Sequence, residues 1–166
     1  MSKVILIHPG AAKEIYGPLA KFSAAEPPLW CRLIGGYLQD REHTVTIIDA
    51  EAQWLSAAEV TEIVSVASPS LVVLVVYGHQ PSASTQQMIG ARKTARAIKD
   101  RIPDLKIIMV GNHCSALPVK TLLEEPTDYV CDGEGPVTIE GLLTDQPLEL
   151  IPGLVWRDGA TIRQNS

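Results

Sequence analysis

Six consecutive apolar residues, Leu71 to Val76, constrain the fold of this chain more than any other stretch. The run is rich in β-branched residues, and an apolar run without alternating polar positions is typical of a strand buried on both faces of a parallel sheet. The next residues, Tyr77 to Ala83, are polar and rich in turn formers, and Ser84 with Gln87 has the spacing of a capping box that opens a helix. We therefore expect a loop at the carboxyl end of a central strand, where ligands of open α/β sheets bind.

Strand-like and helix-like segments alternate along the rest of the chain. Short apolar runs predict further strands at Lys3–Ile7, Thr44–Ile48, Lys106–Val110 and Tyr129–Cys131. Helices are expected to begin at Pro28, Ser56, Ser84, Pro118 and Pro136, which all suit a helix start. Residues 11–27 show no clear period and are expected to form a long loop. This alternation predicts an α/β fold, a flavodoxin-like or Rossmann-like doubly wound sheet of five parallel strands in the order 2-1-3-4-5.

The spacing of apolar residues also predicts which helical side chains face the core. They are Trp30, Leu33, Ile34, Tyr37, Leu38, Val60, Ile63, Val64, Ala67, Met88, Ala91, Ala95, Ile98, Ile102, Leu122, Leu123, Val137, Ile139, Leu142 and Leu143. Ser56 and Glu59 form a second capping box. Near the C-terminus, Leu154–Arg157 and Ala160–Arg163 flank Asp158-Gly159, the two-residue turn signature of a β-hairpin. We expect residues 1–145 to form the domain and residues 146–166 a linker and hairpin.

Charge and composition argue against several kinds of partner. The 166-residue chain has a net charge of −5 and its 14 basic residues are scattered, whereas a nucleic-acid partner requires clustered Lys and Arg. No apolar run approaches the roughly 18 residues of a membrane span, and the N-terminus lacks a signal-peptide layout, so we expect a cytoplasmic protein without membrane contact. Three widely spaced cysteines, Cys31, Cys114 and Cys131, predict reduced and mostly buried thiols.

Four strand-end turns are expected to meet at one edge of the sheet and to form a binding crevice. Glycines let the main chain approach a ligand, so Gly111 and Gly133 are expected to serve binding more than folding, and the hydroxyls of Ser82, Ser84 and Ser115 suit amide or phosphate groups. The candidate binding residues are Pro9, Gly10, Tyr77, Gly78, His79, Gln80, Ser82, Gly111, Asn112, His113, Ser115, Gly133, Glu134 and Gly135.

Two common ligand classes of this fold are disfavoured by the motifs. After the first strand the chain reads His8-Pro9-Gly10 instead of Gly-x-Gly-x-x-Gly, and it has no Gly-x-x-x-x-Gly-Lys loop for phosphates. A receiver domain needs acidic residues where this chain has His8 and Tyr77. A flavodoxin-like protein that binds a nucleotide or flavin, and an interaction domain without a cofactor, stay open as alternatives.

Several segments, in this order, resemble the N-terminal cobalamin-binding domain of cobalamin-dependent radical-SAM enzymes. They are Pro27-Pro28-Leu29, Asp49-Ala50, Gly111-x-His113 with Ser115-Ala116-Leu117-Pro118, Tyr129-Val130 and Gly133-Glu134-Gly135. The resemblance spans residues 3–163 and implies that the domain binds cobalamin base-off, with the nucleotide tail detached from cobalt and buried among the strand-end loops. It also implies a radical-SAM catalytic domain as partner, in cis or in trans, that performs methyl transfer or another radical reaction.

The chain departs from this family at positions that bear on chemistry. The family's Gly-Gly-Pro-His after the fourth strand is Val110-Gly111-Asn112-His113 here, and the basic residue that often precedes Gly-Glu-Gly is Asp132. The Asp-x-His-x-x-Gly motif that ligates cobalt in other cobalamin domains is absent, as is the Cys-x-x-x-Cys-x-x-Cys of an iron–sulfur cluster. We therefore expect no catalytic residue, no protein ligand to a metal and no iron–sulfur cluster in this chain.

The histidines and tryptophans receive separate expectations. His79 is expected nearest to cobalt, since its loop faces the lower side of the corrin ring in this family, and His113 coincides with a loop histidine of the family. His8 is expected to satisfy backbone groups at a strand end, and His43, among charged residues, is expected to face solvent. Two of the three tryptophans, Trp30 and Trp156, are expected to pack in the core or between domains.

Overall fold

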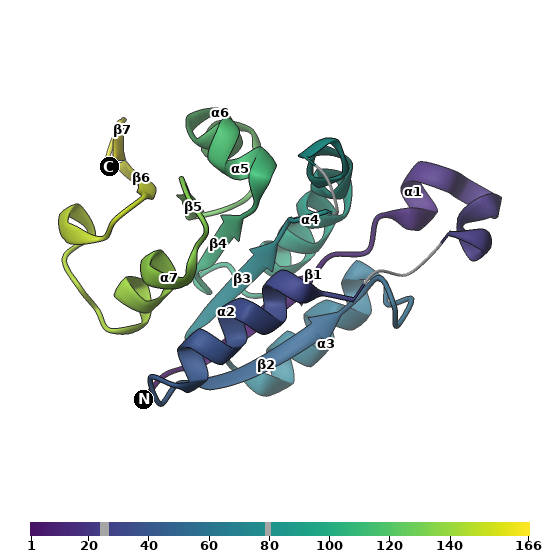
Figure 1. Ribbon diagram of the computed structural model, residues 1–166, viewed down its shortest axis with the longest axis horizontal. Coiled ribbons are helices and arrows are strands. Elements are labelled where there is room, and N and C mark those ends of the chain that lie inside the picture. Colours follow the sequence, from purple (N-terminus) through teal and green to yellow (C-terminus); the bar gives the residue numbers. More distant parts are fainter. Residues whose placement is uncertain (24–26, 79–80) are drawn as a thin grey trace.

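The computed structural model describes residues 1–23, 27–78 and 81–166, which are built around one seven-stranded sheet (Figure 1). The strands are β1 (Lys3–His8), β2 (Thr44–Asp49), β3 (Leu71–Val75), β4 (Ile107–Val110), β5 (Tyr129–Cys131), β6 (Leu154–Asp158) and β7 (Thr161–Gln164). Their order is β2-β1-β3-β4-β5-β6-β7. The first five run parallel in the predicted order 2-1-3-4-5, which confirms the flavodoxin-like α/β fold.

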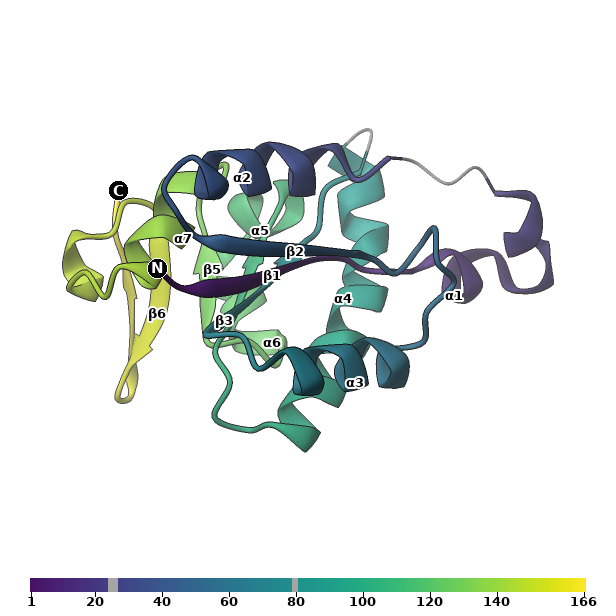
Figure 2. The same cartoon turned by 90° about the horizontal axis from the view of Figure 1, so that it is seen from below.

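Helices cover both faces of the sheet. The α-helices are α1 (Ala12–Tyr16), α2 (Leu29–Gln39), α3 (Ala57–Ala67), α4 (Pro81–Arg101), α5 (Asn112–Ala116), α6 (Pro118–Glu124) and α7 (Pro136–Leu143), with two 3-10 helices, η1 (Gly17–Phe22) and η2 (Leu148–Leu150). One core contains Ile34 of α2 and Ile139 of α7, and the other contains Val64 of α3 and Ala95 of α4. Figure 2 shows α2 on one side of the strands and α3 with α6 on the other.

The strand β3 is the buried centre that its sequence predicts. Alternate residues of a strand point to opposite faces, so a strand between two helical layers must be apolar throughout. No residue of β3 is more than 3% exposed. Leu74 pairs with Ile7 of β1 on one side and with Met109 of β4 on the other.

The two predicted capping boxes have different outcomes. At Ser56 the prediction is confirmed, because the Glu59 amide donates to the Ser56 hydroxyl and the Ser56 amide donates to the Glu59 carboxylate. At Ser84 it is wrong. The helix α4 already begins at Pro81, and the buried Ser84 hydroxyl donates to the Val76 carbonyl at the end of the central strand. A side chain that is committed to another element cannot cap its own helix.

Four residues that were expected to face the core are exposed instead. They are Leu33 (53% exposed), Ile63 (40%), Leu123 (64%) and Val137 (51%). Three of them lie directly beside a buried apolar residue in the same helix, namely Ile34, Val64 and Leu122. Neighbouring helical residues point about 100° apart, so only one of each pair faces a flat sheet.

Two segments that were predicted as loops contain short helices. Residues 12–22 of the stretch predicted as a long loop form α1 and η1, and α5 begins directly after Gly111. The N-terminal amides of α1, those of Ala11 and Ala12, donate to the Glu51 carboxylate at 2.6 and 3.3 Å. Glu51 lies about 40 residues away from these amides in the sequence, so no local pattern predicts the helix. Figure 2 shows α1 beyond the carboxyl ends of the strands.

The predicted hairpin is present and continues the main sheet. Strand β6 runs antiparallel to β5, and Asp158 pairs with Thr161, so the turn residues are Gly159 and Ala160 and lie one position later than predicted. The Arg157 guanidinium donates to the carbonyls of Thr127 and Leu122, which fixes the hairpin against the domain. No helix among the described residues is long and apolar enough to cross a bilayer.

Gly111 has a structural role that the sequence analysis did not expect. Its φ of +150° is one that L-residues rarely adopt, and a Cβ there would overlap the Val76 carbonyl. The Val76 amide in turn donates to the Val110 carbonyl at 2.7 Å. The glycine therefore lets the ends of β3 and β4 approach each other.

We predict that Gly111→Ala lowers the free energy of unfolding by about 2–4 kcal/mol, since it adds both backbone strain and a steric overlap. Urea unfolding followed by circular dichroism measures the change. Gly36→Ala is the matched control, because no atom lies within 4 Å of the added Cβ inside α2. This control should gain roughly 0.5–1 kcal/mol. Equal stability of the two variants would contradict a structural role for Gly111.

Candidate functional site

The segments that follow β1, β3, β4 and β5 lie at one edge of the sheet. The register aligns Ile7 with Leu74, Val75 with Val110, and Met109 with Val130, so parallel strands deliver their carboxyl ends together. This is the edge at which the sequence predicts a crevice. Gly10, Gly78, Gly111 and Gly133 all lie in the segments that the strands present there.

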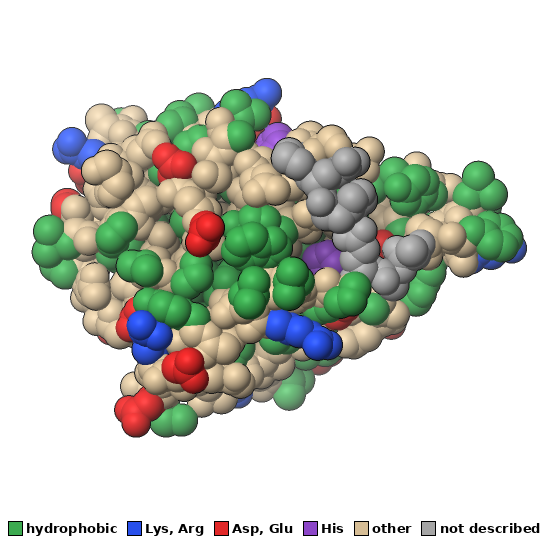
Figure 3. Space-filling view, viewed as in Figure 1, with side chains coloured by type: hydrophobic (Ala, Val, Ile, Leu, Met, Phe, Trp, Pro, Cys, Tyr) green, Lys and Arg blue, Asp and Glu red, His purple; other side chains and the backbone are tan. Residues whose placement is uncertain are grey.

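Two cavities open at this edge, and His8 and Gly78 line both of them. The first, here the α2 cavity, has a volume of about 450 Å³ and is lined by His8, Pro27, Pro28, Leu29, Trp30, Cys31, Val75, Tyr77 and Gly78. The second, the arm cavity, has a volume of about 410 Å³ and is lined by His8, Ala12, Ile15, Tyr16, Leu19, Phe22, Ser23, Glu51, Gly78, Ala83, Gln86 and Gln87. Figure 3 shows that hydrophobic side chains gather over α2. Both volumes are typical of small-molecule sites.

An aromatic pair forms part of the wall of the α2 cavity. The rings of Trp30 and Tyr77 stack with centroids 4.2 Å apart and an interplanar angle of 15°. The Tyr77 hydroxyl donates to the carbonyl of Glu134 at 3.3 Å, which links the end of β3 to the loop after β5. Burial, followed by the charges of nearby acidic groups, raises the pKa of the Tyr77 phenol, so it stays a protonated donor.

His8, which is not among the candidate binding residues, lines the same cavity and pairs with the carboxylate of Asp49. His8 Nδ1 lies 3.2 Å from Asp49 Oδ1, and both side chains are largely buried. Since a carboxylate only accepts hydrogen bonds, Nδ1 carries the proton, and Asp49 fixes the ring as second-shell carboxylates do. One signal was available in the sequence, because His8 and Asp49 end adjacent parallel strands and are register partners.

Cys31 also lines the α2 cavity, and its thiol is uncharged. Burial and then the negative charge of Asp49 raise the pKa of Cys31 to about 12, so the side chain remains a thiol at neutral pH. All three cysteines are free and buried, as the sequence predicts. No group of three or more His, Cys, Asp and Glu side chains that could hold a metal occurs within residues 1–23, 27–78 and 81–166.

A second group of predicted residues is engaged in bonds within the protein. The Ser84 hydroxyl accepts the amide of His113 at 3.0 Å, and His113 Nδ1 lies 3.0 Å from the Thr85 hydroxyl. The Ser115 hydroxyl donates to the Asp132 carboxylate at 3.1 Å. The same carboxylate accepts from the side-chain amide (Nε2) of Gln164 in β7 at 2.9 Å.

The structure thus separates the predicted site residues into groups. Tyr77 and Gly78 line the α2 cavity, Gly78 also lines the arm cavity, and Ser82 is exposed at the start of α4. His79 and Gln80 lie outside the described residues. The other predicted residues, which stay predictions as cofactor contacts, are Pro9, Gly10, Gly111, Asn112, His113, Ser115, Gly133, Glu134 and Gly135.

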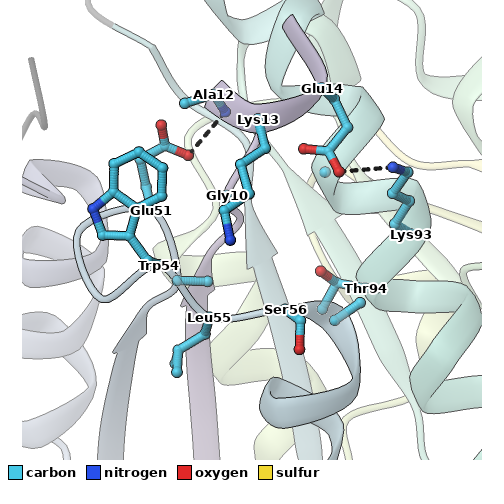
Figure 4. A pocket seen from close by; sticks show the side chains of 13 residues that line it. Gly10, Ala12, Lys13, Glu14, Glu51, Trp54, Leu55, Ser56, Lys93 and Thr94 are labelled. Atoms are coloured by element: carbon cyan, nitrogen blue, oxygen red, sulfur yellow. Dashed lines mark hydrogen bonds and ion pairs between the residues drawn. The ribbon is translucent and has the colours of Figure 1, made fainter. Parts of the chain in front are cut away.

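A smaller cavity of about 150 Å³ lies beneath α1 and is lined in part by Gly10 (Figure 4). Its charged side chains pair with their surroundings, since Lys93 contacts Glu14 at 2.7 Å and the Glu51 carboxylate accepts the first amides of α1. Lys13 lies 5.5 Å from the centroid of the Trp54 ring. These contacts anchor α1, which forms one side of the arm cavity.

Comparisons with known proteins give one consistent result. The family model described as a B12 binding domain matches residues 17–143. The anaerobic magnesium-protoporphyrin IX monomethyl ester cyclase of Synechocystis sp. is 32% identical over 136 residues, which are 79% of this chain and 26% of the relative. The chain therefore spans about a quarter of the length of this curated relative.

Two solved structures share the fold over 99% of the chain. One is the cobalamin-dependent S-adenosylmethionine radical enzyme OxsB with aqua-cobalamin and S-adenosylmethionine bound, with a TM-score of 0.74 at 18% identity and 22% of that chain covered. The other is the radical S-adenosylmethionine methyltransferase TsrM from Kitasatospora setae with cobalamin and a 4Fe–4S cluster bound, with a TM-score of 0.74 at 18% identity and 29% covered.

We predict that Ser84→Ala destabilises the fold by about 1–3 kcal/mol, because it leaves the His113 amide and the Val76 carbonyl without the hydroxyl that joins them. Ser82→Ala, at an exposed position of the same helix, should change stability by less than about 0.5 kcal/mol. Thermal unfolding of both variants measures the difference. An unchanged melting temperature for Ser84→Ala would show that this hydroxyl does not hold the loops together.

Proposed function

Because the chain belongs to the family of B12-binding domains, we propose that it is a cobalamin-binding module of a cobalamin-dependent radical-SAM enzyme of methyltransferase type. The family match over residues 17–143 carries this proposal. The fold shared with two radical-SAM enzymes, one of them a methyltransferase, supports it. We assign the iron–sulfur and S-adenosylmethionine chemistry to a catalytic domain, in cis or in trans.

The side chains at the carboxyl edge fit a corrinoid whose nucleotide tail is detached. We propose that the tail enters the α2 cavity, whose walls are largely apolar and include the neutral Cys31 thiol. An apolar cavity with a few fixed polar groups is the usual form of a small-molecule site. When bound, the corrinoid supplies a cobalt centre that carries a transferable carbon group. The chain itself binds and orients the cofactor and keeps water from the buried tail.

The two parts of the chain, residues 1–145 and 146–166, are proposed to have different roles. We propose that residues 1–145 hold the cofactor and that residues 146–166 lead toward the catalytic part while completing the sheet through the pairing of β5 with β6. A cytoplasmic location agrees with three buried, unpaired cysteines, because thiols stay reduced there.

We further propose that no protein nitrogen ligates cobalt. His79, the expected neighbour of the metal, lies outside the described residues, and His8 is recessed, with 8% of its side chain exposed. Orientation of His8 by Asp49 then serves contacts with the cofactor's organic part and not a metal bond.

We predict stoichiometric binding of hydroxocobalamin in equilibrium dialysis. Flavin mononucleotide and ATP are the comparison ligands, because they represent the flavin and nucleotide alternatives for this fold. Circular dichroism confirms that the dialysed protein is folded. Retention of flavin or nucleotide in place of cobalamin would overturn the proposed function, as would the absence of any corrin at tens of micromolar.

We also predict that the electron paramagnetic resonance spectrum of the bound cobalt(II) form lacks triplet splitting of the cobalt lines. Free cobalamin in this oxidation state, with its own base coordinated, is the control that shows the triplet. Triplet splitting that disappears in His8→Ala or His79→Ala would identify a histidine ligand. Splitting that survives in both variants would mean that the cofactor keeps its base on cobalt.

A further inference from the structure

The small cavity beneath α1 is enclosed by segments of the chain that are far apart in sequence. Its walls come from α1, the loop after β2, the start of α3 and the middle of α4 (Figure 4). Gly90 brings α4 close to the end of β1, because a Cβ at this position would overlap the Gly10 carbonyl. The cavity volume of about 150 Å³ exceeds the space that one water molecule needs and falls below that of sites for drug-sized ligands. The cavity therefore has room for a small polyatomic ligand and not for a nucleotide.

The side chain of Thr94 lines this cavity without a hydrogen-bond partner among the described residues. Thr94 is 4% exposed, and Figure 4 shows it facing the space between α1, α3 and α4. The comparable buried hydroxyl of Thr61, in α3, donates to the Ala57 carbonyl at 2.7 Å. A buried hydroxyl without a partner is unfavourable, so the position of Thr94 suits a ligand that accepts its hydrogen bond.

Lys13 brings a positive charge to the cavity that no carboxylate neutralises within residues 1–23, 27–78 and 81–166. Its ammonium group lies 5.5 Å from the centroid of the Trp54 ring, and Figure 4 shows the side chain reaching down from α1 into the cavity. The other charged side chains of the lining are already engaged. Lys93 pairs with Glu14 at 2.7 Å, and the Glu51 carboxylate accepts the first amides of α1.

The start of α3 adds a second positive feature. This helix is 11 residues long, and both Ser56 and Ala57 at its beginning line the cavity. The first amides of a helix lack partners within the helix and carry a partial positive charge. The Glu59 carboxylate, which could compete for them, is engaged by the amide and the hydroxyl of Ser56. The Ala57 amide thus donates to no residue in the described part of the chain.

We propose that the cavity beneath α1 binds a small oxyanion of the phosphate or sulfate class. An ammonium group from α1, a hydroxyl from α4 and the start of α3 surround it, and such an anion has enough oxygen acceptors for all three. A cation is disfavoured, because both carboxylates of the lining are engaged and two lysines lie beside them. The cavity shares no lining residue with the α2 cavity, so this inference does not rest on the proposed function.

The test compares thermal unfolding in phosphate, sulfate and chloride at equal ionic strength, with dissociation constants from isothermal titration calorimetry. Phosphate and sulfate should raise the melting temperature above its value in chloride, because a ligand of the folded state stabilises that state. Lys13→Met should weaken phosphate binding by at least about tenfold, since hydrogen bonds to charged groups are the strong ones. Lys21→Met is the matched control, because Lys21 also lies over an aromatic ring of the arm, that of Phe22 at 5.0 Å, and does not line the cavity.

Thr94→Val gives a second, independent readout, because it removes the hydroxyl and keeps the shape of the side chain. Thr121→Val is its control, since Thr121 is also buried, in α6, and its hydroxyl has no partner among the described residues. In chloride neither variant should lose thermal stability, because each removes a buried hydroxyl that bonds to nothing in the protein. Only Thr94→Val should lose the stabilisation by phosphate.

Phosphoethanolamine distinguishes the source of the oxyanion. Binding as tight as that of inorganic phosphate would assign the site to a phosphoryl group on a larger molecule, and much weaker binding would assign it to the free anion. Two results would overturn the inference. One is stabilisation by phosphate and sulfate that does not exceed that by chloride, and the other is an unchanged phosphate response in both Lys13→Met and Thr94→Val. In either case the cavity holds only water.

Discussion

The burial of β3 on both faces is the constraint on which the rest of this structure depends. A strand without polar positions requires a helical layer on each side and a parallel neighbour on each edge, here β1 and β4. Parallel neighbours in turn require crossovers, which place every connecting loop at the ends of the strands. The crevice at the carboxyl edge is therefore a geometric result of the central strand, before any side chain of the site is considered.

The sequence predicts the strands well, because each is specified by its own apolar residues. It also predicts the helix start at Ser56, where the two partners lie three residues apart. The same reasoning is wrong at Ser84, since that hydroxyl bonds to Val76 and His113, which belong to other elements. The helix α1 is missed for a similar reason, because Glu51 caps it from a distant loop. Local patterns fail where the decisive partner is remote.

The site shows the same limit. Its place at the strand ends follows from topology and is predictable, whereas its composition depends on pairs that are far apart in sequence. His8 with Asp49 and Trp30 with Tyr77 exist only once the sheet and α2 are assembled. Gly111 is a glycine of the kind expected in a loop that contacts a ligand. The close approach of the Val76 carbonyl, however, already explains why a glycine is needed at this position. A glycine in a strand-end turn therefore identifies a tight backbone and leaves open whether a ligand requires it.

Asp132 gives the C-terminal hairpin a mechanical connection to the crevice. One oxygen of its carboxylate holds Ser115 of α5 and the other holds Gln164 of β7, so a displacement of the last strand reaches two loops through a single side chain. Asp132 thus tethers the last strand to the strand-end segments, and tension on the C-terminal strand can be transmitted through it to the edge of the sheet.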